Sequence, residues 1–592
     1  MRFFILSFLP MLLAAQGIQL TVEQGYASRH RSPGATAHIW AQQNTATTVF
    51  AGWEGDTQYL LDPASPYTTL RLPNTNLRLR ATYRNVPAWN YRTENFAGIP
   101  VTHYIPPNPI GLVFLFHGTG GSGLGQFTGS EFLSLARDLV ANGLGVAAFD
   151  CLNRESGQWD TNTAGPANPD VVRVNNVVAA MRAQGLIGAT LPLLAFGHSN
   201  GGQFSHFSAQ VLNWAAVYIS CVQGSNPAAQ NYSGPVAWWM GKNDDHPQVG
   251  PTGVATSVAR YEIVANRRLP ARHWIDAAMP IYPERFARSL YVNATDSTLV
   301  YDIFKSRGWL DANDFLLRNP NEDYWRAAMP SRFTATQLLA IQGQLEASNA
   351  GHEWANHHPN FVVDHFLRAI GRKPAIRPLN AASYTGASIA PASIATIFDT
   401  GLEGAQATVR STDGREQAAT WFYVSPAQAS FLTPASLPAG EAVLKLSSPE
   451  RRMSYPISIA NAAPGIFTAN GNGIGVPAAL ILRVTPSDQR TIEYPFAQGS
   501  AGFVASPINF ANDRLFLDLY ATGVRGAAAN VQVILGGETI QPLYAGAQPQ
   551  FAGLDQVTFE LPSSFKGRGR VEAIVVANGQ RSNVVELNFG NQ

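Results

Sequence analysis

The sequence predicts a multidomain protein with a central, doubly wound α/β domain, a small all-β module before it and two β-sandwich-like lobes after it. Between residues 90 and 371, strand-like apolar runs alternate with helical patterns, which is typical of a mostly parallel sheet covered on both faces. Short alternating runs come before this region, and short strands rich in Gly, Pro, Ala and Ser come after it. At 592 residues, the chain is also too long for one core.

Residues 1–17 have the pattern of an export signal. Arg2 precedes an apolar run from Phe3 to Leu13, which small residues follow. This run is shorter than the roughly 18 apolar residues that span a bilayer. We therefore expect a secreted protein, extracellular or periplasmic, without an integral membrane segment. A net charge of +1 and a charged fraction of 14% argue against nucleic acid as a partner.

Residues 18–86 form the expected all-β module. Leu77, Leu79, Ala81 and Tyr83 alternate with polar residues, as in a half-buried strand. The motifs T-V-E-Q-G-Y, V-F-A-G-W-E-G-D and T-T-L-R-L-P-N resemble the bacterial repeat module related to the B-repeats of internalin-type surface proteins. This resemblance implies a packing module with Trp53 in its core. Contact with a polysaccharide or a cell surface is the alternative.

In the central region, residues 90–371, five apolar runs predict buried strands, and residues at helical spacing before Gly143 and Gly185 predict two helices. Cys151 and Cys221 end two of these strands, which the predicted fold places three positions apart, or about 14 Å at roughly 4.8 Å per strand. A disulfide needs Cα atoms within about 7 Å, which favours two free thiols. The expected strands are 112–116, 144–149, 191–196, 215–221 and 236–240.

Residues 245–345 are expected to be an aromatic-rich insertion, either a helical cap over the site or a peripheral subdomain. Residues 372–378 read as a stiff linker. Beyond it, the segment I-F-D-T-G-L at 397–402 recurs as L-Y-A-T-G-V at 519–524, which predicts two lobes, 379–465 and 466–592. These stretches resemble a two-lobed C-terminal domain of many exported bacterial proteins.

The stretch L-P-L-L-A-F-G-H-S-N-G-G at 191–202 carries the main functional signal. A strand meets a G-x-S-x-G turn and then a helix, which is the context of a nucleophile elbow centred on Ser199. A catalytic serine needs a histidine as base and an acid that orients the histidine. After a nucleophile elbow, these residues occur along the chain in the order serine, acid, histidine. Asp244 fits the acid position, with Asp245 as the alternative, unless the N-D-D turn is only solvated.

The base is expected on a late loop before the last helix. His352, in G-H-E-W, lies there, and His357, His358 and His365 are rivals. The glycine before His352 and Trp354 after it resemble the base loop of polyester depolymerases and feruloyl esterases. A zinc-protease interpretation of H-E-W-A-N-H fails because Asn356 stands where the second histidine is needed. Contact of His357 and His358 with an ion is the alternative to a solvated or capping role, and we expect no metal and no cofactor.

The oxyanion of the tetrahedral intermediate needs two N–H donors. We expect one from Asn200, directly after the nucleophile. The other is expected from Thr119 or Gly120 in H-G-T-G-G-S-G, which resembles the H-G-G-G loop of lipases and esterases. Trp239 and Trp354 are candidate substrate-binding residues.

Together, residues 90–371 resemble secreted α/β-hydrolases of the polyhydroxybutyrate depolymerase and feruloyl esterase type. The resemblance implies a serine hydrolase that cleaves small or polymeric carboxylic esters through an acyl-enzyme. Two alternatives remain open: a serine peptidase of the same fold, and a catalytically inactive binding or surface protein.

Overall fold

The computed structural model describes residues 18–591, so the predicted export signal lies outside the described part. The chain divides into two compact units. The first contains residues 18–91 together with Phe127–Asn142 and Ala278–Val362, and the second contains Arg92–Gln126, Gly143–Ala277 and the remainder from Val363. Among the described residues, no helix combines the length and apolar character needed to cross a membrane.

The second unit is built on a sheet with the order β7-β8-β10-β9-β11-β12-β13-β14. Strands β10, β9 and β11 to β14 are parallel, whereas β8 and β7 add antiparallel strands at the β10 edge. The strands are β7 (Arg92–Phe96), β8 (Ile99–Tyr104), β9 (Gly111–Phe116), β10 (Leu144–Phe149), β11 (Leu193–His198), β12 (Val217–Ser220), β13 (Val236–Gly241) and β14 (Ala271–Asp276).

Strand β9 lies between β10 and β11, so the winding direction of the sheet reverses around it. The carboxyl ends of β9 and β11 are therefore neighbours, with Phe116 paired to Gly197. In open α/β sheets, ligands bind beside the carboxyl ends of the strands at such a reversal. The loops that follow Phe116 and His198 occupy this position.

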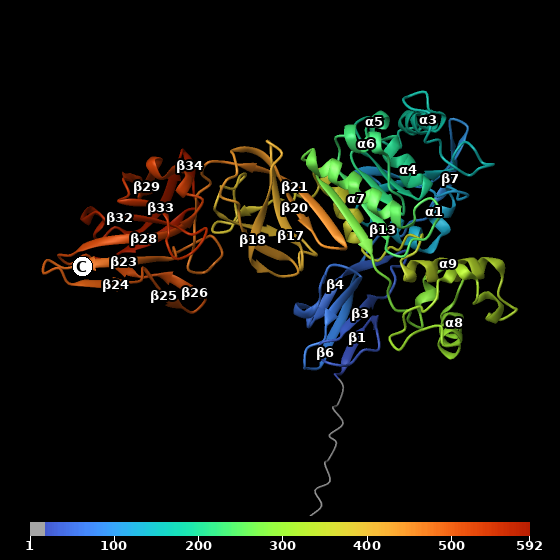
Figure 1. Cartoon of the computed structure of the whole chain (residues 1–592), viewed down its shortest axis with the longest axis horizontal. Coiled ribbons are helices and arrows are strands. Elements are labelled where there is room, and N and C mark those ends of the chain that lie inside the picture. The colour runs from blue at the N-terminus through green and yellow to red at the C-terminus, as the bar shows by residue number, and fades with distance from the viewer. Residues whose placement is uncertain (1–17, 592) are drawn as a thin grey trace, which may run out of the picture. The chain divides into compact units, whose positions relative to one another are not determined.

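Helices follow the parallel strands of this unit (Figure 1). Helix α3 shows how the sequence sets their ends: Asn168 caps it by accepting the N–H groups of Asp170 and Val171, and Gly185 follows its end with a positive φ. The helices are α3 (Pro169–Ala183), α4 (Asn200–Phe207), α5 (Ala209–Leu212), α6 (Asn226–Asn231) and α7 (Gly250–Asn266). Two more, α1 (Gly125–Thr128) and α10 (Pro359–Ala369), cross the limits of the units.

The region expected as an insertion, 245–345, begins later than predicted. Helix α7 packs on β13 and β14, and β14 pairs in parallel with β13 over six residues. The sheet thus continues to Asp276. The prediction failed here because A-R-H-W-I-D mixes polar and apolar residues instead of forming the apolar run of the other strands.

The seven strands after the linker, here called lobe 1, join this sheet directly, because β21 pairs antiparallel with β14. Their order is β15-β16-β19-β18-β17-β20-β21. The strands are β15 (Leu379–Asn380), β16 (Ile394–Phe398), β17 (Gln406–Ser411), β18 (Glu416–Val424), β19 (Gln428–Leu432), β20 (Gly440–Ser447) and β21 (Arg451–Ile459).

The remaining strands, here called lobe 2, enclose a separate apolar core. One sheet has the order β24-β23-β28-β32-β31 and another β27-β35-β33-β29-β30. The strands are β22 (Gly465–Ile466), β23 (Ala479–Val484), β24 (Arg490–Glu493), β25 (Phe496–Gly499), β26 (Gly502–Ala505), β27 (Pro507–Ile508), β28 (Arg514–Thr522), β29 (Val531–Leu535), β30 (Glu538–Ile540), β31 (Tyr544–Ala547), β32 (Asp555–Glu560), β33 (Gly569–Ala577), β34 (Gln580–Arg581) and β35 (Val585–Phe589).

The two copies of the sequence repeat have the same strand register in the two lobes. Phe398 in β16 pairs with Gln428 in β19, and Tyr520 in β28 pairs with Gln556 in β32. The repeated sequence motif therefore marks an antiparallel strand pair with the same register in each of the two lobes.

The first unit contains two three-stranded sheets, β1-β6-β4 and β2-β3-β5, with Trp53 buried in the core between them, as predicted. Residues 278–362 of this unit carry a second apolar core, in which Tyr301 and Trp325 are buried. The elements are β1 (Leu20–Glu23), β2 (Gly25–Ala27), β3 (Thr36–Ala41), β4 (Thr48–Gly55), β5 (Tyr67–Arg71), β6 (Leu77–Asn85), α2 (Ser130–Ala141), α8 (Ala294–Ser306) and α9 (Ala335–Asn349).

Candidate functional site

Ser199 occupies a strained turn between β11 and α4. Its backbone has φ of +52° and ψ of −125°, a conformation that L-residues rarely adopt. The turn is held because the Ser199 N–H donates to the carbonyl of Ser220 at 2.8 Å, and the Ser199 carbonyl accepts from the N–H of Gln203 at 3.0 Å. Such strain at a strand-to-helix turn is characteristic of a nucleophile elbow.

The glycines around Ser199 are required by close backbone packing. A Cβ at Gly197 would lie 2.2 Å from the carbonyl oxygen of Gly201. A Cβ at Gly201 would lie 2.3 Å from the carbonyl oxygen of Phe116. Real Cβ atoms do not approach backbone oxygens this closely, so the G-x-S-x-G spacing is a steric condition of the turn.

The loop after β9 lies against the serine. A Cβ at Gly118 would come within 3.2 Å of the Ser199 Cβ. The Gly120 N–H already donates to the carbonyl of Gly157 at 3.0 Å. Among the described residues, the Thr119 N–H has no acceptor, so this geometry favours Thr119 over Gly120 as the second oxyanion donor.

His117 is fixed as a neutral ring in the same loop. Its Nε2 accepts the N–H of Cys151 at 3.1 Å, so Nδ1 carries the proton and donates to the Gly118 carbonyl at 2.7 Å. Burial lowers the pKa of His117, which agrees with a neutral ring. His117 therefore shapes the loop. Cys151 and Cys221 are buried thiols that are not joined in a disulfide, as predicted.

Two adjacent aspartates follow β13 with different environments. Asp244 is buried, with 4% of its surface exposed, whereas Asp245 is exposed. One oxygen of the Asp244 carboxylate accepts the N–H of His246 at 3.1 Å. A buried, oriented carboxylate suits the acid of a triad, so these environments favour Asp244.

His352 belongs to the first unit, in the loop between α9 and α10, and its side chain is half-buried. The rival histidines are engaged elsewhere. His357 accepts from Arg285 at 3.0 Å, and burial lowers its pKa well below the usual value. His358 contacts the Ser65 hydroxyl at 2.9 Å. His365 donates to a backbone carbonyl of β12 at 3.0 Å, and burial lowers its pKa to about 3.

A network of buried carboxylates anchors the loop that carries His352. The backbone N–H of Asn356 donates to Glu131 of α2 at 2.9 Å. Arg288 also binds the Glu131 carboxylate, at 2.8 and 2.9 Å, and Gln344 donates to it at 3.0 Å. The arginine holds the pKa of Glu131 well below its ordinary value, despite burial. Burial raises the pKa of Glu353, beside His352, to about 8, with further contributions from nearby carboxylates.

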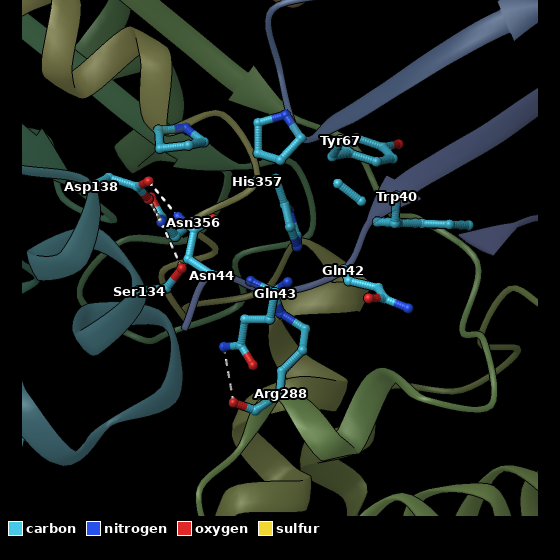
Figure 2. Close-up of a pocket in the computed structure, with 13 residues that line it drawn as sticks. Trp40, Gln42, Gln43, Asn44, Tyr67, Ser134, Asp138, Arg288, Asn356 and His357 are labelled. Atoms are coloured by element: carbon cyan, nitrogen blue, oxygen red, sulfur yellow. Dashed lines mark hydrogen bonds between the residues drawn. The ribbon is translucent and has the colours of Figure 1, made fainter. Parts of the chain in front are cut away.

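Figure 2 shows a pocket of the first unit that borders this network. Asp138 accepts from Asn44 at 2.6 Å and from Asn356 at 2.9 Å, and Asn356 also donates to Ser134 at 3.0 Å. The cavity volume is about 20 Å³, which is room for about one water molecule. This pocket is therefore too small for an acyl chain or a sugar.

The two tryptophans proposed for substrate binding are both buried. Trp239 lies in β13 with 3% of its surface exposed, and Trp354 is 1% exposed. Neither ring offers a face to a bound molecule in this structure. Among residues 18–591, no group of three or more His, Cys, Asp or Glu side chains is arranged to hold a metal ion.

Sequence reasoning missed Trp159. Its backbone N–H donates to the Asn200 side chain at 2.7 Å, and its indole N–H donates to the His117 carbonyl at 2.9 Å. Trp159 lies in a loop, R-E-S-G-Q-W-D, that has no periodic pattern and no catalytic motif. Only the three-dimensional structure brings it to the candidate site.

No known protein-family model matches the chain, and no curated protein matches it. Similar solved structures include TT1662 from Thermus thermophilus, at 20% identity over 32% of this chain and 89% of that one, with a TM-score of 0.23. A soluble variant of monoglyceride lipase from Saccharomyces cerevisiae gives 23% identity over 23% of this chain and 44% of the lipase, with a TM-score of 0.16.

A third structure is SGBP-B of the Bacteroides ovatus mixed-linkage glucan utilization locus, in complex with a mixed-linkage heptasaccharide. It is 9% identical over 37% of this chain and 46% of that chain, with a TM-score of 0.19. Similarity at this level does not establish a shared fold.

Proposed function

We propose that the protein is a serine hydrolase of the α/β-hydrolase type that cleaves carboxylic esters. The observation that carries this proposal is the Ser199 turn, with its positive φ and with glycines that backbone contacts require. Its place beside the carboxyl end of β9, where the winding of the sheet reverses, supports the same conclusion.

In the proposed reaction, the Ser199 hydroxyl attacks the ester carbonyl carbon while His352 accepts its proton. His352 then gives this proton to the leaving alcohol, and Asp244 orients and stabilises the imidazolium. The N–H groups of Thr119 and Asn200 stabilise the oxyanion. Water hydrolyses the acyl-enzyme, again with His352 as the base, and restores Ser199.

The decisive experiment is labelling with a fluorophosphonate probe together with turnover of short p-nitrophenyl esters. Wild type should label and turn over, whereas Ser199→Ala should do neither. The control is Ser233→Ala, because Ser233 is exposed and lies in the turn after α6. Wild-type protein that neither labels nor hydrolyses esters would favour the inactive binding protein. Labelling with cleavage of peptides alone would favour the peptidase.

We further propose export and an ester of polymeric or plant origin as the substrate, in line with the predicted signal at residues 1–17 and with the flanking β regions. Expression of the full chain in a bacterial host, with N-terminal sequencing of the exported product, tests the first point. A panel of feruloylated polysaccharide, acetylated polysaccharide and polyhydroxybutyrate tests the second. An intact N-terminus in the cytoplasmic fraction would contradict export.

A further inference from the structure

The loop of residues 151–160, here called the strap, is fixed at both ends by one carboxylate. Asp170, at the start of α3, accepts the N–H of Leu152 on one oxygen and the N–H of Asp160 on the other, each at 2.8 Å. Asp170 is 1% exposed. A buried carboxylate that holds both ends of a loop restricts its movement strongly.

The middle of the strap contacts the candidate oxyanion residues on both sides. The Gly157 carbonyl accepts the N–H of Gly120 at 3.0 Å. The Trp159 backbone N–H donates to the Asn200 side-chain oxygen at 2.7 Å, and the Trp159 indole donates to the His117 carbonyl at 2.9 Å. Trp159 thus donates hydrogen bonds both to the loop that contains His117 and Thr119 and to the side chain of Asn200, the two places that supply the proposed N–H donors.

The Trp159 ring is itself held rigidly. It is 2% exposed, and it stacks on Phe204 of α4 with ring centroids 5.0 Å apart. It also meets the edge of Phe116 at 5.0 Å and Phe149 at 5.6 Å. These contacts come from β9, β10 and α4, so the position of the Trp159 ring is fixed relative to the sheet and to the helix that follows Ser199.

We propose that Trp159 is a positioning residue of the oxyanion hole. This inference rests on the proposed function. Oxyanion stabilisation is effective when the donors are already in place as charge develops, because the protein then pays no reorganisation during the reaction. The indole N–H sets the His117 carbonyl and hence the peptide units up to Thr119, while the backbone N–H of Trp159 sets the Asn200 side chain.

The test is Trp159→Phe, which keeps an aromatic ring and removes the indole N–H. The matched control is Trp214→Phe: Trp214 is also 2% exposed and packs on Phe116, but its indole donates to Ser208, away from the strap. We expect kcat for p-nitrophenyl esters to fall about 10-fold or more in Trp159→Phe, with KM little changed, because loss of a whole donor costs about 10²–10³-fold.

A second readout separates positioning from folding. A trifluoromethyl ketone that adds to the serine mimics the oxyanion, so its inhibition constant should rise in parallel with the loss of kcat in Trp159→Phe and stay at the wild-type value in Trp214→Phe. Asn200→Ala, which removes the other bond and leaves the indole intact, should show the same pattern if Trp159→Phe fails to fold.

The outcomes are distinct. If wild type labels at Ser199 and hydrolyses esters, but kcat and inhibitor affinity in both Trp159→Phe and Asn200→Ala match those of Trp214→Phe, the positioning role is wrong and the proposed function stands. If wild type neither labels nor hydrolyses esters, the proposed function itself fails.

Discussion

The backbone of Gly201 passes so close to Phe116 that a Cβ at position 201 would lie 2.3 Å from the Phe116 carbonyl oxygen. This contact joins the first turn of α4 to the end of β9. It sets how near the serine turn can come to the loop that supplies an oxyanion donor. The two loops with proposed catalytic roles can therefore lie this close together only because residue 201 has no Cβ.

We therefore expect Gly201→Ala to displace α4 from β9 and to lower ester turnover by at least about 10²-fold, the cost of losing an oxyanion contact. The control is Gly188→Ala, because Gly188 is exposed, has an ordinary φ and would place its Cβ in open space. Initial rates with p-nitrophenyl acetate, together with circular dichroism for folding, measure the effect. Equal rates in the two variants would show that the contact relaxes without consequence.

The two aspartates after β13 give a matched pair for the triad acid. Asp244→Asn should lower kcat on the order of 10³- to 10⁴-fold, because the amide would not stabilise the imidazolium. Asp245→Asn should leave kcat within about twofold of wild type, since its exposed carboxylate is screened by solvent. Steady-state kinetics on both purified variants decide between them. A larger loss in Asp245→Asn would exchange the two roles.

The sequence predicted the parts of the fold that have regular patterns. The apolar runs at 112–116, 144–149 and 236–240 are buried strands, and the repeat at 397–402 and 519–524 occupies equivalent registers. Strand β14 was not predicted, because its polar and apolar residues do not alternate regularly. One of its neighbours in the sheet is β21, which is far away in the sequence.

In the candidate site, too, residues in a local sequence motif could be predicted, whereas residues placed by long-range contacts could not. Ser199 and its glycines are local signals, because a sharp turn imposes its own sequence. The preference for Thr119 over Gly120 depends on the hydrogen bond between Gly120 and Gly157. The ring contacts of Trp159 depend on side chains of β9, β10 and α4. Such contacts leave no periodic mark in the sequence.

Asp138 is expected to make the stability of the protein depend on pH. Burial raises its pKa from 3.8 to about 7, against the lowering effect of its bonds to Asn44 and Asn356. The folded state then binds this proton more tightly than the unfolded chain. The free energy of unfolding should therefore fall as pH rises from about 4 to about 7, and this contribution should be constant above that range.

Thermal unfolding of wild type and Asp138→Asn between pH 4 and pH 9 tests this expectation. The fall in the midpoint with rising pH should be smaller in Asp138→Asn. The pKa of Glu353 is also raised, to about 8, so this group too makes the protein less stable as pH rises. The unfolding midpoint of Asp138→Asn should therefore still fall slightly with rising pH. Asp302→Asn, an exposed change in α8, is the control. Parallel midpoint curves for wild type and Asp138→Asn would contradict a raised pKa at Asp138.

Lobe 1 is tied to the central sheet by an ion pair beside the junction of β14 and β21. Asp399 accepts from Arg272 of β14 at 2.6 Å and from the Tyr455 hydroxyl of β21 at 2.6 Å. The carboxylate raises the pKa of Arg272 above its ordinary value, against the effect of burial. In the sequence repeat, Asp399 corresponds to Ala521, which lies in the apolar core of lobe 2.

Asp399→Asn should destabilise the protein by about 3 kcal/mol, because it removes the carboxylate that binds the partly buried guanidinium of Arg272. Scanning calorimetry should show a lower midpoint for the transition that contains the central sheet. The control is Glu560→Gln, which breaks an exposed pair with Arg514 in lobe 2 and should cost less than about 1 kcal/mol. Replacing both partners, Asp399→Leu with Arg272→Met, should recover much of the loss, since removal of an entire buried pair is often neutral. If the double variant is less stable than Asp399→Asn, the expectation is wrong. The attraction between Asp399 and Arg272 then stabilises the junction by more than the cost of leaving Arg272 unpaired.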